Sequence, residues 1–242
     1  GSNLLIRDGG LEALVIFTHR GLSDIDVTER DRDTLFYASA GVALPKLARF
    51  SANMGFEGAE FMAGIPGSVG GGLAMNAGCY GSEVWDYVER VRTITSDGEI
   101  MERVPSDYIV EYRKVSGKGQ RKEFFIGGWF RFNVGEKEKS RAKIKELLKR
   151  RVQDQPLSKP NSGSVFRNPD GDFAARLIEK SGLKGLQRGA AIVSNKHANF
   201  IINSGGATAK NIEDLILEVQ SVVKLNSGVK LKREVHIMGD HC

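Results

Sequence analysis

The segment AGIPGSVGGGLAMNAGCYG, residues 63–81, restricts the possible folds of this chain more than any other stretch. It holds seven glycines and no charged residue. Because glycine has no Cβ and adopts positive φ angles without strain, such a run lets another group come close to the backbone. Backbone amides exposed in this way bind phosphate oxygens. The alternative interpretation is a mobile or tightly packed loop, and the glycine count alone leaves both open.

Two standard phosphate-binding motifs are missing from the chain. It has no G-x-x-x-x-G-K-[ST], and its glycines are not spaced as G-x-G-x-x-G at the start of a helix. The net charge of +5 is dispersed over the 242 residues, except in 137–151. That stretch is typical of a solvated amphipathic helix, with Ile144, Leu147, Leu148 and Val152 on one face. This distribution argues against nucleic acid and favours an anionic small molecule such as a nucleotide.

Cysteine content and hydropathy indicate the compartment. Cys79 and Cys242 cannot form a disulfide framework and lack the paired spacing of a zinc site, so we expect no metal and a reducing environment. No window approaches the roughly 20 apolar residues that span a bilayer, and no signal peptide opens the chain. We therefore expect a cytoplasmic protein without a membrane partner. The initial Gly-Ser indicates either a vector scar or a start within a longer protein.

Hydrophobic periodicity predicts an α+β architecture. We expect strands at 13–18, 34–41 and 123–133, a hairpin over 88–105 around Ser-Asp-Gly, and a helix at 44–55. Beyond residue 153 we expect helices at 173–182 and 209–228 and strands at 197–205 and 231–239. The change from a strand-rich first part to a second part that mixes helices and strands predicts two domains, 1–152 and 153–242.

Seven short motifs in a fixed order carry a family resemblance. They are GSNLL (1–5), AGIPGSVGG (63–71), MNAGCYG (75–81), YR (112–113), NSGSVFRNP (161–169), SNKHANFIIN (194–203) and REVHIMG (233–239). The chain resembles the UDP-N-acetylenolpyruvoylglucosamine reductase family over essentially its whole length. The resemblance implies an FAD-binding domain followed by an α+β substrate-binding domain. It also implies a monomer that uses NADPH to reduce UDP-N-acetylglucosamine enolpyruvate to UDP-N-acetylmuramate in peptidoglycan precursor synthesis.

The resemblance also implies which residues contact FAD. The first and second motifs would wrap its diphosphate and ribityl chain, and the third would continue the cradle near the flavin. For Asn76 alone, an ordinary turn cap is the better interpretation. The implied FAD contacts are Ser2, Asn3, Leu4, Gly64, Ile65, Pro66, Gly67, Ser68, Gly71, Asn76, Ala77, Gly78 and Gly81.

Three residues match the catalytic positions of the family. Ser164 would donate a proton to carbon, while Arg113 and Glu234 would polarise the substrate carboxylate. Without the resemblance these three would be read as a turn hydroxyl, a surface arginine and an edge-strand charge. The implied substrate contacts are Tyr112, Arg113, Asn168, Ser162 and His197, and for His197 a site role and a core role both stay open.

The chain departs from the family pattern in several places. The pattern has a segment before GSNLL, so we expect a flavin domain that is N-terminally truncated. His236 stands at a usual arginine, which makes one positive contact pH-dependent, and Val115 stands at a usual serine. The short spacing from Arg113 to Ser164 favours the shorter, second type of the family. Two alternatives are another FAD-dependent oxidoreductase of this fold and a non-catalytic UDP-sugar-binding fragment.

Overall fold

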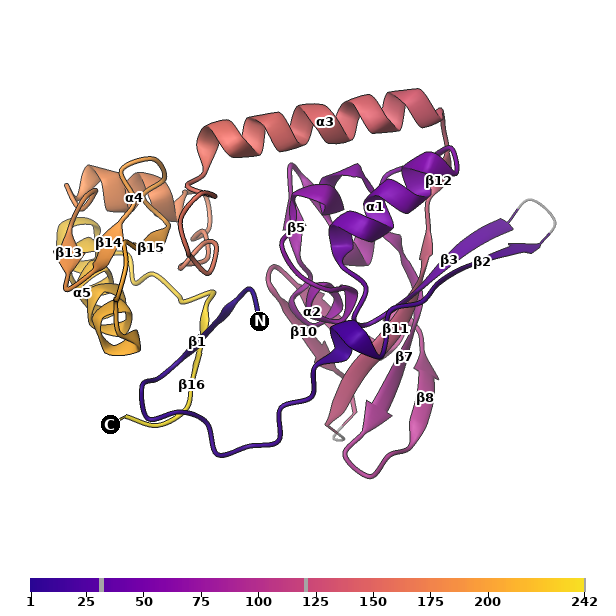
Figure 1. The fold of residues 1–242 in the computed structure, drawn as a ribbon, viewed down its shortest axis with the longest axis horizontal. Coiled ribbons are helices and arrows are strands. Elements are labelled where there is room, and N and C mark those ends of the chain that lie inside the picture. The colour runs from indigo at the N-terminus through magenta and orange to yellow at the C-terminus, as the bar shows by residue number, and fades with distance from the viewer. Residues whose placement is uncertain (31–32, 120–121, 242) are drawn as a thin grey trace. The chain divides into compact units, whose positions relative to one another are not determined.

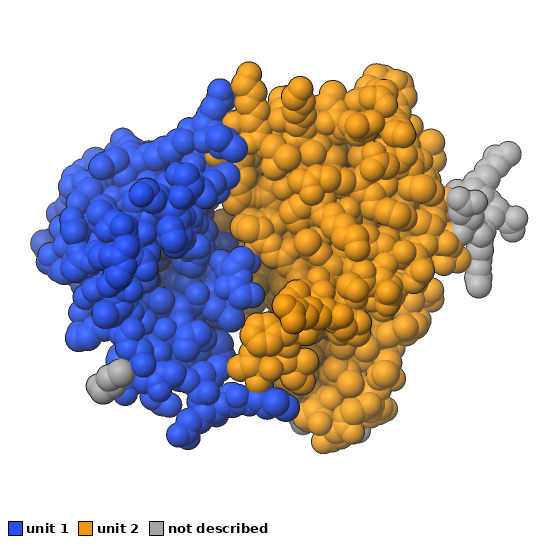
Figure 2. All heavy atoms as spheres, in the orientation of Figure 1, with its two compact units in different colours: residues 1–14, 152–242 blue, residues 15–151 orange. Residues whose placement is uncertain are grey.

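The computed structural model describes residues 1–30, 33–119 and 122–241. The chain forms two compact units, coloured separately in Figure 2. The central unit comprises Val15–Arg151, and the terminal unit combines Gly1–Leu14 with Val152–Cys242. The second break lies within one residue of the expected boundary near 153. Residues 1–14, which we expected in the first domain, belong instead to the terminal unit, where their strand pairs with the C-terminal strand.

A five-stranded antiparallel sheet organises the central unit, in the order β2-β3-β11-β7-β8 (Figure 1). Three of the predicted segments, the strands at 34–41 and 123–133 and the hairpin at 88–105, are confirmed within it. Its strands are β2 (Ile25–Arg30), β3 (Asp33–Ser39), β7 (Val88–Thr95), β8 (Ile100–Arg103) and β11 (Glu123–Arg131).

The strand predicted at 13–18 is wrong. Residues 13–17 belong to no strand, and the 3-10 helix η1 (Thr18–Arg20) follows them. The side chains of Leu14, Ile16 and Phe17 are exposed. The β-branched and aromatic residues that favour strands do so because they pack well against neighbouring strands. This segment has no neighbouring strand among the described residues, so its composition does not produce one.

Helices and short strands complete the central unit. Helix α1 (Leu44–Asn53) confirms the prediction at 44–55, with Pro45 in its first turn. Helix α3 (Lys137–Asp154) buries Ile144 and Leu147 as expected, but Val152 is exposed. The other elements are β4 (Phe56–Glu57), η2 (Glu60–Gly64), α2 (Val69–Met75), β5 (Gly78–Cys79), β6 (Ser82–Glu83), η3 (Val84–Tyr87), η4 (Pro105–Asp107), β9 (Tyr108–Glu111), β10 (Lys114–Gly117) and β12 (Asn133–Val134).

The terminal unit joins the two ends of the chain. Strand β1 (Leu4–Ile6) runs parallel to β16 (His236–Met238), and the two lie side by side in Figure 1. Helices α4 (Ala174–Lys180) and α5 (Ala209–Ser227) confirm the predictions at 173–182 and 209–228. A second sheet contains β13 (Gln187–Arg188), β14 (Ala191–Val193) and β15 (Ile201–Asn203).

Two predicted strands of the terminal unit are shorter than expected. The segment 197–205 is a strand only at 201–203, and 231–239 only at 236–238. The first half of the latter instead pairs with the segment around Phe166, through a bridge between Phe166 and Arg233. Each unit has its own buried core, centred on Phe36 and Phe130 in the central unit and on Leu215 and Ile216 in the terminal unit. The fold is α+β, as predicted.

Candidate functional site

The glycine-rich segment is fastened to the chain that precedes α1. The amide of Leu44 donates to the carbonyl of Gly67 at 3.0 Å, and the amides of Val69 and Gly70 donate to the carbonyls of Val42 and Ala40 at 2.8 and 2.9 Å. Ser68 is the N-cap of α2, and its Oγ accepts from the Gly71 amide at 3.4 Å. These bonds anchor the segment, so of the alternative interpretation, a mobile or tightly packed loop, they favour tight packing.

The glycines of this segment serve two different purposes. A Cβ on Gly70 would lie 2.9 Å from the Cβ of Ala40, and one on Gly78 would lie 2.6 Å from the carbonyl oxygen of Ser82. These two glycines are required by packing. A Cβ on Gly71 would meet nothing closer than 3.7 Å, and one on Gly81, at φ +86°, would meet nothing within 4 Å. Gly71 and Gly81 are both exposed, so packing within the unit does not explain why these two positions are glycine.

This open backbone fits a phosphate-bearing cofactor. Gly71 and Gly81 present main chain with no side chain in the way, and Ser68 adds a small half-buried hydroxyl beside Gly71. A diphosphate needs close approach to amides and small hydroxyls rather than bulky side chains. Ile65 and Gly67 are half-buried and Pro66 is exposed, so this part of the segment also reaches the surface.

The segment ends in a hydrogen-bonded cluster around Asn76. Asn76 is 2% exposed and closes α2 in a left-handed conformation, with φ 42°. Its Nδ2 donates to Glu83 Oε2 at 2.6 Å, and its Oδ1 accepts from the Trp85 amide at 3.2 Å. Asn76 is therefore a helix cap with a committed side chain, which agrees with the simpler of its two interpretations. Ala77 beside it is half-buried, and its amide donates to the Gly72 carbonyl at 2.9 Å.

Arg113 belongs to the same cluster. It lies in the turn between β9 and β10 with φ 57°, and its guanidinium lies 4.7 Å from the ring of the exposed Tyr112. Arg113 Nη1 donates to the Asn76 carbonyl at 3.1 Å and to Glu83 Oε1 at 3.3 Å. Arg113 Nη2 donates to the Gly78 carbonyl at 2.6 Å. The predicted carboxylate-binding arginine is thus attached to the predicted FAD loop.

The other predicted catalytic residues come together in the terminal unit. The carbonyl of Val165, next to Ser164, accepts from the Glu234 amide at 2.8 Å. Asn3 Nδ2 donates to the Glu234 carbonyl at 3.0 Å, and the His236 amide donates to the Asn3 carbonyl at 3.0 Å. The first, fifth and last motifs of the sequence therefore form one hydrogen-bonded group, in which Ser164 and Glu234 are both half-buried.

Two asparagines that the sequence reasoning missed hold Ser164 in place. Asn161 Oδ1 accepts from the amide of Gly163, which has φ +80°, at 2.9 Å, and this shapes the turn before Ser164. Asn199 is 3% exposed; its Oδ1 accepts from the Phe166 amide at 3.0 Å and its Nδ2 donates to the Phe166 carbonyl at 2.8 Å. An amide in the apolar run HANFII was the available signal, because a buried amide must find partners.

The remaining predicted substrate residues have structural contacts. Asn168 is exposed, and its Oδ1 accepts from the Ala174 amide at 3.0 Å, capping α4. His197 is half-buried, with Nδ1 accepting from the Asn199 amide at 3.3 Å and its ring edge-on to Phe200. Burial lowers the pKa of His197. Ser162 lies half-buried in the same loop as Ser164, and the side chain of His236 is exposed.

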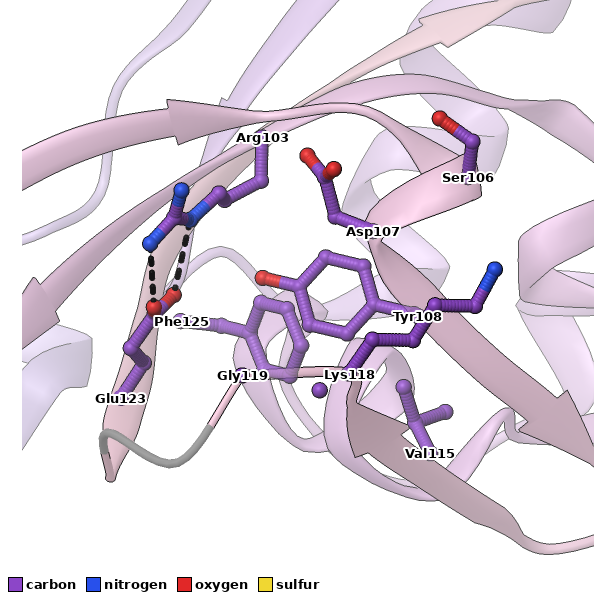
Figure 3. Close-up of a pocket in the computed structure, with 10 residues that line it drawn as sticks. Arg103, Ser106, Asp107, Tyr108, Val115, Lys118, Gly119, Glu123 and Phe125 are labelled. Carbon is purple, nitrogen blue, oxygen red and sulfur yellow. Dashed lines mark hydrogen bonds and ion pairs between the residues drawn. The ribbon is translucent and has the colours of Figure 1, made fainter.

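The central unit also contains a pocket of about 240 Å³, which is lined by a different set of residues (Figure 3). Arg103 and Glu123 form an ion pair at 2.7 Å on one side of it, and burial raises the pKa of Tyr108, which also lines it. Val115, at the position of the usual serine, lines it too, but none of the predicted site residues does.

Neither a metal nor a membrane is indicated by the described part of the chain. It contains no group of His, Cys, Asp and Glu that is able to hold a metal ion, and Cys79 is a free thiol, while Cys242 lies outside the described residues. Within residues 1–30, 33–119 and 122–241, no helix combines the length and apolarity needed to span a bilayer.

Comparison with known proteins assigns both parts of the chain. Residues 1–103 match the model of an FAD-binding domain, and residues 155–238 match that of the C-terminal domain of UDP-N-acetylenolpyruvoylglucosamine reductase. The reductase of that name from Thiobacillus denitrificans is 53% identical over 99% of this chain and 77% of its own length. Its counterpart from Coxiella burnetii is 47% identical over 99% and 80%.

A solved structure agrees with these relatives. The crystal structure of the Thermus caldophilus reductase matches 98% of this chain and 82% of its own, with a TM-score of 0.80 and 32% identity. Such identity over nearly the whole chain, with both domain models matched in order, means that this chain belongs to the UDP-N-acetylenolpyruvoylglucosamine reductase family of FAD-dependent oxidoreductases.

Proposed function

We propose that this chain reduces UDP-N-acetylglucosamine enolpyruvate to UDP-N-acetylmuramate with NADPH, and so supplies a precursor of peptidoglycan. The observation that carries the proposal is the hydrogen-bonded group of the terminal unit, in which Ser164 and Glu234 lie on adjacent segments tied to Asn3. It occurs in a chain that is 53% identical to a protein named as this reductase. A cytoplasmic monomer is part of the same proposal, as expected for an enzyme of nucleotide sugars.

The glycine-rich segment (63–81) and the GSNLL motif (1–5) would hold the cofactor. When bound, FAD supplies the hydride-transfer chemistry between NADPH and the enolpyruvyl double bond. In this chain the open main chain at Gly71 and Gly81 and the hydroxyl of Ser68 would contact it, with Asn76 and Gly78 closing the loop. The full proposed set is Ser2, Asn3, Leu4, Gly64, Ile65, Pro66, Gly67, Ser68, Gly71, Asn76, Ala77, Gly78 and Gly81.

The proposed chemistry of the substrate depends on three side chains. An enol ether accepts a hydride only when its electrons are drawn into the neighbouring carboxylate, and Arg113 would stabilise the negative charge that grows there. Glu234, acting as a protonated carboxyl, would polarise or protonate the same substrate carboxylate. The resulting carbanion-like carbon is basic enough to take a proton from the Ser164 hydroxyl, which water then reprotonates. Tyr112, Asn168, Ser162 and His197 would contact the substrate, although Asn168 and His197 also have the structural partners described above.

Ser164→Ala tests this assignment through the two half-reactions. We expect flavin bleaching by NADPH to keep its wild-type rate, because the proposed role of Ser164 is to protonate the sugar nucleotide after the flavin has been reduced. Flavin reoxidation by the sugar nucleotide should slow by about 10²–10⁴-fold, the usual contribution of a general acid. Stopped-flow absorbance at the flavin band measures both rates. Ser158→Ala, an exposed serine six residues earlier in the chain, is the matched control, and equal reoxidation rates for the two variants would remove Ser164 from the acid role.

A further inference from the structure

The carboxylate of Glu83 lies at the centre of the cluster around Asn76. Its Oε2 accepts from Asn76 Nδ2 at 2.6 Å, and its Oε1 accepts from Arg113 Nη1 at 3.3 Å. The two oxygens therefore have different donors, one from the proposed FAD loop and one from the proposed carboxylate-binding arginine. We propose that Glu83 is a positioning residue of the reductase, which holds the Arg113 guanidinium against the loop in the orientation that the substrate carboxylate requires.

The charge balance of the cluster supports this role. The side chain of Arg113 is 14% exposed, and besides its ion pair with Glu83 it donates to the neutral carbonyls of Asn76 and Gly78. Removal of water from a guanidinium is costly unless an opposite charge lies close by. Glu83, with a side chain 33% exposed, supplies that charge while still reaching solvent.

Backbone strain concentrates in the same place. Among the described residues, three that are not glycine have positive φ: Asn76 at 42°, Tyr80 at 57° and Arg113 at 57°. An asparagine tolerates this region, but an arginine has no side-chain contact to its own backbone that favours it. Such conformations persist only where the surroundings hold them, and they cluster at functional sites. The side-chain contacts of Arg113 to Glu83, Asn76 and Gly78 help to hold this conformation.

The network also joins two parts of the proposed function. The carbonyls that receive the Arg113 guanidinium belong to residues 76 and 78, which are proposed FAD contacts. A shift of that guanidinium by about 1 Å is enough to reduce a rate by about 100-fold. Because Glu83 contacts both Asn76 and Arg113, it fixes the arginine relative to the loop. This inference rests on the proposed role of Arg113 at the substrate carboxylate.

Glu83→Gln is the principal variant, because it keeps the size of the side chain. Both carboxylate oxygens face donors, so the amide of a glutamine must direct its NH₂ group at either Asn76 or Arg113. We expect flavin reoxidation by the sugar nucleotide to slow by about 10–100-fold and the Kd for UDP-N-acetylmuramate, which carries the same carboxylate, to rise about tenfold. Flavin reduction by NADPH and the Kd for FAD, from quenching of flavin fluorescence, should stay within about threefold.

Asp86→Asn is the matched control. Asp86 Oδ2 accepts from the Glu83 amide at 2.8 Å, so this variant disturbs the same turn from an exposed position without touching Arg113. We expect it to keep the wild-type reoxidation rate. If Asp86→Asn slows reoxidation as much as Glu83→Gln does, the turn rather than the carboxylate matters, and the proposal is overturned.

A double-mutant cycle with Arg113→Lys separates positioning from general destabilisation. If Glu83 acts through Arg113, Glu83→Gln adds less than threefold to the defect of Arg113→Lys, whereas independent effects multiply. Multiplying defects, or wild-type reoxidation in Glu83→Gln beside a slow Arg113→Lys, overturn this inference alone. Unchanged reoxidation in Arg113→Lys instead overturns the proposed role of Arg113, and this inference with it.

Discussion

His197 illustrates how a single side chain serves the structure while burial lowers its pKa. Its Nδ1 accepts from the Asn199 amide, so the ring helps to shape the turn that also presents the buried Asn199 amide to Phe166. The neutral ring is the form that accepts this bond, and burial favours the same form by lowering the pKa. These contacts give the half-buried His197 a structural role in its turn, while its substrate role stays a proposal.

The lowered pKa of His197 predicts a pH dependence of stability. The folded pKa lies below the unfolded value, so between the two the unfolded state binds more protons and the free energy of unfolding falls as pH falls. His197→Gln removes this contribution. We therefore expect the urea midpoint of the wild type to fall more steeply than that of the variant as pH drops below about 6.5. Parallel midpoints across pH 5 to 7.5 would refute this assignment.

At the scale of elements, the N-terminal segment caps the longest helix of the terminal unit. Asp8 Oδ1 accepts from the Ala209 amide and Asp8 Oδ2 from the Lys210 amide, both at 2.8 Å. Thr208 Oγ1 also accepts from the Asn211 amide at 3.1 Å. Backbone amides in the first turn of α5 therefore donate to two acceptors, the N-cap Thr208 and Asp8, which lies about 200 residues away in the sequence. The two backbone bonds lower the pKa of Asp8.

Asp8→Ala should loosen the start of α5 and change its response to acid. The pKa of Asp8 is lower in the folded state than in the unfolded state. The stabilisation from its bonds to α5 is therefore present above the unfolded pKa near 3.8 and is lost as the pH falls through the folded pKa. We expect a lower thermal midpoint at pH 7, faster hydrogen exchange at the amides of 209–211, and a smaller difference from wild type below pH 3. Asp214→Asn, which removes an exposed ion pair of the same helix with Lys210, is the control and should change the midpoint less.

At the scale of the whole molecule, each unit contains a separate hydrophobic core. The terminal core gathers residues from both ends of the chain, including Leu5 on β1 and Val235 before β16, while the central core is built around Phe36 and Phe130. Each unit has the internal packing that defines a domain. A substitution in one core is therefore expected to act mainly on its own unit.

Leu215→Ala tests this independence. Leu215 has no exposed surface, and truncating a fully buried leucine costs about 2–5 kcal/mol. We expect hydrogen exchange to accelerate at the amides of α4 and α5, while β7 and β11 keep their wild-type protection. Phe36→Ala in the central core should give the reverse pattern, at a cost of about 3–5 kcal/mol. Equal acceleration in both units in either variant would contradict the separation.

Local sequence patterns predicted many of the helices and strands. The helix at 44–53, the helix at 209–227 and the hairpin at 88–103 agree with the sequence to within a few residues, because periodicity and turn residues act over short distances. The strand predicted at 13–18 is wrong for the complementary reason. Its apolar composition resembles a strand, but a strand requires a partner, and no local pattern specifies one.

The sequence by itself determined where the motifs lie, the α+β class and the family, since these depend on residue order and local pattern. Only the tertiary structure decided that residues 1–14 pack with 152–242, that Asn161 and Asn199 hold Ser164, and that Arg113 is attached to residues 76–83. Partners such as Arg113 and Gly78, or Asn3 and Glu234, are 35 and 231 residues apart. Their pairing is fixed by register and packing across the folded chain, which leave no periodic trace in the sequence between them.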